Sequence, residues 1–215
     1  MKEKVKEFII NNIKWIILFI CLIGFLALAE DVFNKEIMNG DILGYKFIST
    51  FLISDFATPI AKFITNFGGA IFIAGVTIFL AIIIKNKKIG ISIFANLVII
   101  TGLNQLLKRI LQRPRPTEYR IIEETGYSFP SGHSMISMAF YGYLIYLIYK
   151  YVENKYLKWI LISLLSVLIC LIGISRIYLG VHYTSDVLGG FLISISYLVI
   201  YISAVNKFLI EKETN

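Results

Sequence analysis

Charged residues are scarce in this sequence of 215 residues. Asp, Glu, Lys and Arg make up 16% of it, hydrophobic residues make up 57%, and the mean hydropathy is +0.76. Because about a quarter of the residues of a typical soluble domain are charged, this composition excludes an ordinary soluble domain. We expect one compact membrane domain over residues 1–215, with no soluble domain appended.

Cysteine is almost absent, which excludes a disulfide framework and a cysteine-based metal site. Cys21 and Cys170 each lie inside a long apolar run, and such isolated thiols are interpreted as packing residues. Carboxylates do not gather around any candidate site, so a divalent metal has no evident ligands. We therefore expect neither a metal nor another cofactor.

Long apolar runs take the place of the missing charge. Six of them stand out, at residues 15–29, 63–84, 89–107, 134–149, 157–174 and 187–205. A helix needs ~20 residues to cross a bilayer, and backbone groups inside lipid must bond within their own segment, so these runs predict helices. The predicted fold is an all-α integral membrane bundle of six transmembrane helices.

The first run has some features of a cleaved signal peptide. Lys2, Lys4 and Lys6 precede it, and Ala27, Leu28 and Ala29 end it. Apolar character already begins at Phe8, so the segment is long enough to span a membrane, and we expect it to be retained as a signal anchor. Residues 30–62 mix apolar and charged side chains, which fits either short amphipathic helices at the outer interface or an ordered loop that caps the bundle.

The basic residues indicate the orientation. The net charge is +7, but these residues lie in short loops between apolar runs, where they indicate topology and headgroup contacts, so no nucleic-acid partner is expected. With both termini inside, 12 of the 21 Lys and Arg residues fall inside and nine outside, and six of those nine cluster around the histidines. Setting the six aside as functional leaves 12 against three, which predicts a multi-pass plasma-membrane protein with both termini cytoplasmic.

Only two histidines occur, and each lies where an apolar run meets a loop on the same predicted outer side. Histidine is the side chain best suited to nucleophilic attack and proton transfer near neutral pH. Four predicted helix ends bring polar residues to the same face as the histidines: Lys108, Arg109, Arg113, Arg115, Ser131, His133, Ser175, Arg176, His182 and Asp186. This convergence predicts a phosphate site, because arginine forks and lysine ammonium groups match phosphoryl oxygens.

The start of the fourth run adds backbone donors to this predicted site. Ser131 is placed as the N-cap of a helix, where free N–H groups and the helix dipole favour an anion. Gly132 lets the backbone approach the phosphate oxygens closely.

Three motifs around this face carry a family resemblance. The first is a lysine followed, after six residues, by Arg-Pro, at residues 108–116, and the second is Pro-Ser-Gly-His at residues 130–133. The third is Ser-Arg, five residues, His, three residues and Asp, at residues 175–186. Each motif alone is weak, but all three are complete and in order. From the third predicted helix onward the chain resembles the type-2 phosphatidic acid phosphatase family, in the membrane branch that includes bacterial phosphatidylglycerophosphate and undecaprenyl diphosphate phosphatases.

The resemblance implies a role for each motif residue. His182 would be the nucleophile that takes the phosphoryl group, Asp186 would hold its imidazole in the reactive tautomer, and His133 would be the general acid. The phosphate oxygens would be bound by Lys108, Arg115, Ser131, Gly132, Ser175 and Arg176.

Several charged residues near the motifs lie outside them. Arg109, Arg113 and Arg120 are interpreted as headgroup-facing or solvated, and Glu123 and Glu124 as solvated loop residues. The cations would take the place of a metal, so we expect metal-independent catalysis.

The resemblance implies a membrane phosphatase that hydrolyses lipid phosphate or diphosphate through a phosphohistidine, at the outer interface. The family offers undecaprenyl diphosphate, phosphatidylglycerophosphate and phosphatidic acid as substrates, and the sequence does not choose among them. A lipid phosphotransferase using the same intermediate remains an alternative. A lipid transporter is less favoured, because the ionisable residues gather at span ends and not at the midplane. Besides the substrate and membrane lipids, no obligate protein partner is expected.

Overall fold

The computed structural model describes residues 2–36 and 38–210. Over these residues the chain is all-helical, with no β-strand. The helices are α1 (Lys2–Phe33), α2 (Asn39–Phe51), α3 (Ala57–Asn66), α4 (Ala70–Ile83), α5 (Lys87–Leu111), α6 (Gly132–Tyr151), α7 (Lys155–Tyr178), α8 (Thr184–Val205) and the π-helix η1 (Asn206–Ile210). Ile37, in the segment expected at the interface, and Lys212, used in the topology argument, lie outside the described residues.

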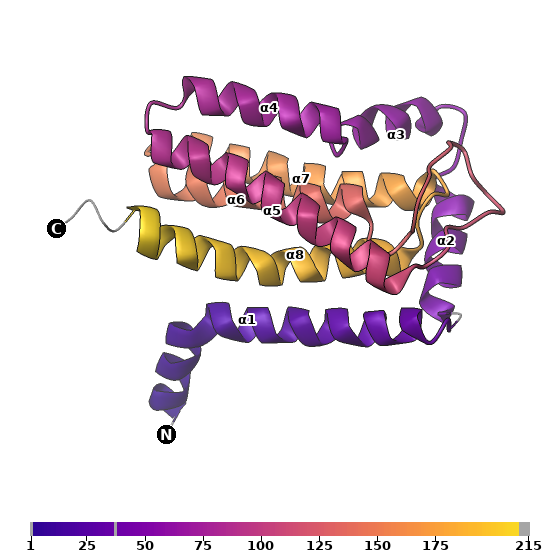
Figure 1. Ribbon diagram of the computed structural model, residues 1–215, viewed down its shortest axis with the longest axis horizontal. Coiled ribbons are helices and arrows are strands. Elements are labelled where there is room, and N and C mark those ends of the chain that lie inside the picture. Colours follow the sequence, from indigo (N-terminus) through magenta and orange to yellow (C-terminus); the bar gives the residue numbers. More distant parts are fainter. Residues whose placement is uncertain (1, 37, 211–215) are drawn as a thin grey trace.

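The long helices lie side by side in one bundle, and α2 lies across one end of it (Figure 1). Helix α6 packs against α5, α7 and α8, and α1 packs against the outer side of α8. The long loop between α5 and α6 lies at the same end as α2, opposite the end at which α1 begins and α8 ends (Figure 1). This end of the bundle also holds the two predicted histidines, because α6 begins and α7 ends there.

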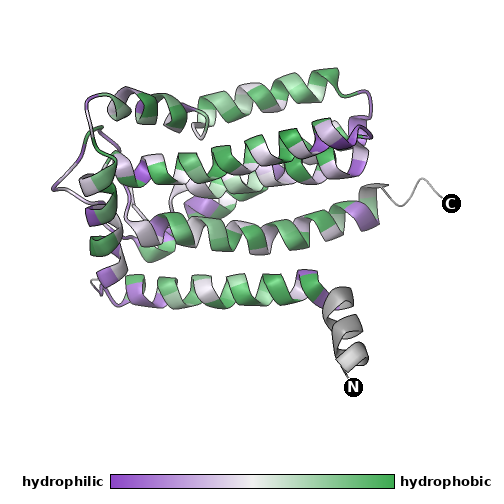
Figure 2. Ribbon diagram, turned by 180° about the vertical axis from the view of Figure 1, so that it is seen from behind, coloured by the Kyte–Doolittle hydropathy of each residue, from purple (hydrophilic) through white to green (hydrophobic). Residues whose placement is uncertain are grey.

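Four helical segments of the described chain are long and apolar enough to cross a membrane: Asn12–Phe33, Lys87–Leu111, Lys155–Tyr178 and Thr184–Phe208. Helices α3 and α4 together make a fifth candidate if this bent pair counts as one span. Hydrophobic residues follow these helices along most of their length (Figure 2). The fold is thus an integral membrane bundle with four or five candidate spans. Helix α6 is not among them, because it carries five tyrosines and a histidine.

The predicted unbroken run at residues 63–84 is wrong in its middle. The helix is interrupted after Asn66, and α3 and α4 meet at an angle of 47°. Helix α3 ends at Asn66, and Gly69, whose backbone is extended with φ −73° and ψ 146°, precedes α4 as its N-cap. The break lies next to the candidate site described below.

The segment at residues 30–62 contains the end of α1, all of α2 and the start of α3. Helix α2 is amphipathic: it buries Asp41 and Ile48 and exposes Leu43, Phe47 and Phe51. It also covers the end of the bundle (Figure 1). The two alternatives for this segment, an amphipathic helix and a cap, therefore describe the same element.

Local capping places the helix ends that carry the motifs. The side chain of Asn86 accepts from the N–H groups of Lys88 and Ile89 and starts α5, and Gln112 ends it in the left-handed conformation, with φ 46°. Ser131 starts α6, since its hydroxyl accepts from the N–H of Ser134. These caps set where the loop between α5 and α6 leaves and rejoins the bundle.

Candidate active site

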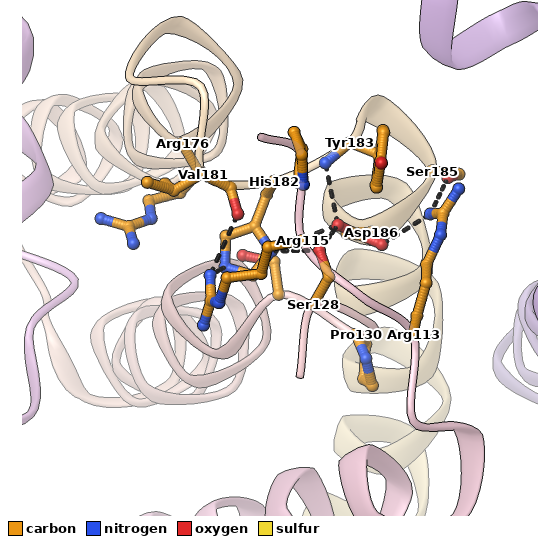
Figure 3. Close-up of polar contacts among 12 residues, drawn as sticks. Arg113, Arg115, Ser128, Pro130, Arg176, Val181, His182, Tyr183, Ser185 and Asp186 are labelled. Carbon is orange, nitrogen blue, oxygen red and sulfur yellow. Dashed lines mark hydrogen bonds and ion pairs between the residues drawn. The ribbon is translucent and has the colours of Figure 1, made fainter. Parts of the chain in front are cut away.

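His182 and Asp186 form a buried pair between α7 and α8 (Figure 3). Nδ1 of His182 lies 3.2 Å from Oδ2 of Asp186, which sits in the first turn of α8. A carboxylate accepts at Nδ1, so the imidazole proton resides there and the lone pair resides on Nε2. Burial lowers the pKa of His182 to about 4, although Asp186 acts in the opposite direction. The imidazole is thus neutral near pH 7, the form that a nucleophile requires.

Asp186 receives three further hydrogen bonds. The backbone N–H of Tyr183 donates to Oδ2 at 2.8 Å, and the hydroxyl of Ser128 donates to the same oxygen. Nη1 of Arg113 donates to Oδ1 at 2.7 Å. Ser128 was not singled out in the sequence, where its only signal is its position two residues before the Pro-Ser-Gly-His motif.

Arg113 is not solvated, and its interpretation as a headgroup-facing residue is wrong. Its guanidinium bridges Asp41 and Asp186, with both N–O distances 2.7 Å, and it lies 4.1 Å from the ring centre of Tyr183. A planar arginine fork can serve two carboxylates at once, which a surface role does not require. The partner from α2 could not be foreseen, because Asp41 is 72 residues away in the sequence.

A cavity of about 500 Å³ opens beside this pair. Six of the residues predicted for the site lie on its wall: Lys108, Arg115, Gly132, His133, Arg176 and His182. Arg109, which lies outside the motifs, also lines it. The wall thus combines four cationic side chains with both histidines, which suits a phosphoryl group because its non-bridging oxygens carry the negative charge.

Arg115 is fixed by carbonyl groups of its surroundings. Its guanidinium donates to the carbonyl oxygens of Thr125, Gly126 and Val181, each at 3.0 Å. Its Nη1 also lies 3.0 Å from Nε2 of His182. Arg115 therefore holds a cation directly beside the nitrogen that would attack phosphorus.

Lys108 and Arg176 approach the cavity from α5 and α7. The ammonium group of Lys108 donates to the carbonyl oxygens of Tyr127 and Ser128. Arg176 is almost completely buried and donates to Thr65 at 2.8 Å and to Glu124 at 2.5 Å. Its Nε has no hydrogen-bond partner among the described residues, so it retains a donor for an anion.

Glu124 is a second correction to the sequence interpretation. It is not a fully solvated loop residue: it lines the cavity and pairs with Arg176. Burial raises its pKa, but Arg176, His133 and Arg115 act more strongly together and hold the pKa below its usual value, so the carboxyl is ionised. Arg120 is partly exposed and lies 3.9 Å from the exposed Glu123, in agreement with their solvated interpretation.

His133 stands at the start of α6, on the cavity wall. It needs the glycine at the α3–α4 break, because a Cβ on Gly68 would lie 3.1 Å from Cδ2 of His133 and 2.7 Å from Ile172. Gly132 would bring a Cβ to 3.2 Å from Oδ1 of Asn104, whose amide holds the carbonyl of Pro130 at 3.2 Å. The start of α6 is therefore closely fitted to α5 and to the break.

Ser131 and Ser175 lie near the cavity without lining it. The hydroxyl of Ser131 is fully buried and is used by Ser134, both as the helix cap and at 3.0 Å between the two hydroxyls. The hydroxyl of Ser175 donates to the carbonyl of Ile172 at 2.6 Å, within its own helix. Direct phosphate contacts from these two hydroxyls remain predictions.

Sequence comparison agrees with this geometry. Residues 88–210 match the PAP2 superfamily, and the match includes all three motifs. The chain belongs to the PAP2 superfamily. The family expected from the motifs is thus confirmed.

Three similar proteins illustrate the relationship. Phosphatidylglycerophosphatase B of Bacillus subtilis is 43% identical over 91 residues, which cover 41% of this chain and 44% of that protein. The match therefore spans less than half of that relative. Undecaprenyl-diphosphatase of Sulfolobus acidocaldarius is 29% identical over 180 residues, covering 80% of this chain and 79% of that one. The crystal structure of a transmembrane PAP2-type phosphatidylglycerophosphate phosphatase from Bacillus subtilis aligns with a TM-score of 0.77 and 26% identity, over 89% of this chain and 96% of that one. The names of these relatives support an interpretation of this protein as a lipid phosphate hydrolase.

Proposed function

We propose that this PAP2 protein hydrolyses a lipid phosphate or diphosphate through a phosphohistidine on His182. The observation that carries the proposal is the orientation of His182, with Nδ1 held by Asp186 at 3.2 Å and Nε2 beside Arg115 at the cavity wall. In this tautomer the lone pair lies on Nε2, and it would attack phosphorus once the phosphate oxygens take over the donor of Arg115 that it now accepts.

The reaction would have two steps. The Nε2 lone pair attacks phosphorus, the bond from phosphorus to the lipid oxygen breaks, and His133 gives that oxygen a proton. Burial and Arg176 lower the pKa of His133 to about 3, so this step requires the negative charge of the bound phosphate to raise that pKa and bring a proton onto His133. Water then attacks phosphorus, the P–N bond breaks, and inorganic phosphate leaves while His182 returns to its neutral form. In the second step His133 takes the proton from water, as the reverse of its first role requires.

Cations would stabilise the charge that develops on the transferred group. Lys108, Arg115 and Arg176 surround the cavity, and each donor that serves the transition state more strongly than the bound substrate lowers the barrier. Among residues 2–36 and 38–210 no group of three or more His, Cys, Asp or Glu side chains could hold a metal ion. Metal-independent catalysis is a prediction of this proposal, and activity in the presence of EDTA tests it.

We place the site at the outer face of the plasma membrane, with both termini cytoplasmic. The counting of Lys and Arg supports this orientation. Helix α6 would be the sixth span, because it has 20 residues and packs against α5, α7 and α8. Its Tyr141 and Tyr143 are buried in the bundle, and its exposed Tyr149 and Tyr151 lie at its end, where tyrosines suit the membrane interface. Impermeant thiol labelling tests the orientation: a cysteine replacing Thr117 should react from outside, and one replacing Lys87 should not. The reverse pattern would place the site in the cytoplasm.

The substrate would be an amphiphile whose phosphate enters the cavity from the outer leaflet. The relatives are named for phosphatidylglycerophosphate, undecaprenyl diphosphate and, in mammals, sphingosine 1-phosphate, all of which present a phosphate on a lipid. An outward site would suit the recycling of undecaprenyl diphosphate, by analogy with the relative named for that lipid.

Phosphate release from a panel of lipid phosphates tests the proposal. Purified protein in detergent should release phosphate in the presence of EDTA, and His182→Ala should lose at least several orders of magnitude in rate. Asp55→Asn, a change at an exposed residue at the same end of the bundle, is the control and should behave as the wild type. Release by the His182→Ala variant at a comparable rate would sink the proposal. Adding lipid or sugar hydroxyls as acceptors distinguishes hydrolysis from phosphotransfer.

A further inference from the structure

A chain of charged groups runs from α2 to the proposed nucleophile. Asp41 of α2 accepts from Nη2 of Arg113 at 2.7 Å, and Nη1 of the same guanidinium donates to Asp186 at 2.7 Å. Asp186 in turn holds Nδ1 of His182 at 3.2 Å. The four groups are buried, so this chain lies largely outside solvent screening.

Ser185 forms hydrogen bonds with both Asp41 and Arg113. Its backbone N–H and its hydroxyl donate to the two oxygens of Asp41, at 2.7 and 2.8 Å, and Arg113 donates to the same hydroxyl at 2.7 Å. Asp41 therefore ties α2 both to the start of α8 and to the loop after α5. Both carboxylate oxygens of Asp41 thus accept hydrogen bonds, and this arrangement defines where the Arg113 guanidinium lies.

Close contact between α2 and α8 is a second, independent observation. A Cβ on Gly44, one turn after Asp41, would lie only 2.2 Å from Oγ1 of Thr184 and 3.1 Å from its Cγ2. Gly44 is thus needed for α2 to lie this close to the residue that begins α8. The opposite face of α2 exposes Leu43, Phe47 and Phe51, so the helix contacts α8 on one side only.

Neither Asp41 nor Arg113 lines the cavity. We propose that Asp41 and Arg113 are positioning residues, which fix the carboxylate of Asp186 and through it the imidazole of His182, so that α2 is a working part of the catalytic centre. This inference rests on the function proposed above.

The physical reason lies in the two oxygens of Asp186. Oδ2 serves His182, Ser128 and the Tyr183 N–H, whereas Oδ1 is held by Arg113. Without the arginine, the carboxylate can rotate about its Cβ–Cγ bond, and its full negative charge acts on the imidazole. With Arg113 anchored by Asp41, the plane of the carboxylate is fixed and part of its charge is neutralised.

Four variants test the chain: Asp41→Asn, Arg113→Gln, Arg113→Lys and Gly44→Ala. Lys46→Gln, at an exposed residue of α2, is the control. The measurements are kcat and KM for phosphate release, the pH profile, and the thermal stability of the purified protein. Since Arg113→Gln removes a buried cation and can impair folding, Arg113→Lys and Gly44→Ala keep the charge count and carry the test independently.

We expect Asp41→Asn and Arg113→Gln to lower kcat by about 10- to 100-fold, with KM changed much less. This is the range found when residues that hydrogen-bond metal-binding histidines are replaced. The double variant, which combines Asp41→Asn with Arg113→Gln, should lose no more kcat than the worse of the two single variants, because both changes interrupt the same chain of charged groups. Gly44→Ala should reproduce the kcat loss without changing any charge. A structural role alone would lower the yield and stability but leave kcat per folded molecule unchanged.

The pH profile separates the two ends of the chain. The groups that face His182 are Asp186 from α8, Arg115 and Ser128 from the loop, Arg176 from α7 and His133 from α6. Without the Arg113 charge, the negative charge of Asp186 favours a protonated His182 more strongly. The acid limb of kcat should therefore move to higher pH in Arg113→Gln. It should not move upward in Asp41→Asn, where the arginine cation remains.

Two results would overturn the inference. If Asp41→Asn, Arg113→Lys and Gly44→Ala all keep kcat within about twofold of the wild type while folded, α2 does not position the nucleophile. If losses in the single variants multiply fully in the double variant, the two residues do not act as one chain. A wild-type protein that releases no phosphate from any lipid would instead sink the proposed function, and this inference with it.

Discussion

Asp186→Asn is the change that tests the geometry of the site most sharply, because it removes one charge and almost no volume. The aspartate accepts at both oxygens, from Arg113 at Oδ1 and from His182, Ser128 and the Tyr183 N–H at Oδ2. An asparagine offers one acceptor oxygen and one NH₂ group. Whichever way the amide is turned, its NH₂ group therefore faces a group that now donates to Asp186.

Both orientations of the amide impair the reaction. If the NH₂ group faces Arg113, two donors meet at a position where the N–O distance is now 2.7 Å, and the pair is pushed apart. If it faces His182, the imidazole must accept at Nδ1, and its proton moves to Nε2. The lone pair that would attack phosphorus is then gone, which is the wrong-tautomer effect of such a substitution in hydrolytic triads.

The expected loss in kcat is about 1,000- to 10,000-fold, by comparison with the same substitution in a serine protease triad. This corresponds to about 4 to 5.5 kcal/mol of transition-state stabilisation, at about 1.4 kcal/mol per factor of ten. The variant should also be less thermostable, because Arg113 loses one of its two buried partners.

The assay is release of inorganic phosphate from a lipid phosphate in detergent, at saturating substrate, with Asp55→Asn as the matched control. Thermal unfolding, measured on the same samples, shows which fraction of the protein is folded. A kcat within about threefold of the wild type would refute the reasoning, since it would mean that the tautomer of His182 does not depend on Asp186.

Three further predictions concern the two histidines and the glycine at the helix break. Because burial lowers the pKa of His182 to about 4, the imidazole is protonated only as the pH falls through that value; kcat/KM should therefore keep its acid limb near pH 4, and a limb near 6.5 would contradict the buried neutral state. Gly68→Ala would bring a Cβ to 3.1 Å from His133 and 2.7 Å from Ile172, so it should lower kcat by at least tenfold, whereas Gly75→Ala, with open space around it, should not. His133→Ala should impair hydrolysis of a monoester such as phosphatidic acid more than that of a polyprenyl diphosphate, because a phosphate leaving group is less basic than an alkoxide; equal losses would remove the general-acid role.

Helices and motifs were the parts of this protein that local sequence could predict. Apolar runs marked α5, α6, α7 and α8 to within a few residues, because a lipid environment leaves the backbone little alternative to a helix, whereas α1 begins 13 residues before the first predicted run. One feature escaped this logic. The second run is interrupted between Asn66 and Ala70, although apolar residues lie on both sides of the interruption.

Part of the cavity wall was predictable because six of its residues belong to motifs with fixed spacing. Lys108, Arg115, His133, Arg176 and His182 could be assigned together because the family resemblance carried their roles. Their supporting partners could not, since ion pairs such as Arg113–Asp41 and Arg176–Glu124 join residues 72 and 52 positions apart. Sequence distance gives no indication of such contacts, and a charged residue in a polar loop is by default interpreted as solvated.

The central claim is that the phosphoryl group is transferred to His182, and trapping the intermediate tests it most directly. The purified protein is mixed with a lipid substrate labelled in the transferred phosphate and denatured within milliseconds in alkali. Phosphohistidine survives alkali and is hydrolysed by acid, so its stability identifies the bond. We predict alkali-stable, acid-labile label on the peptide that contains His182, reduced in Asp186→Asn and absent in His182→Ala. Label on another residue, or phosphate release at the wild-type rate with no protein-bound label at any time, would contradict the account.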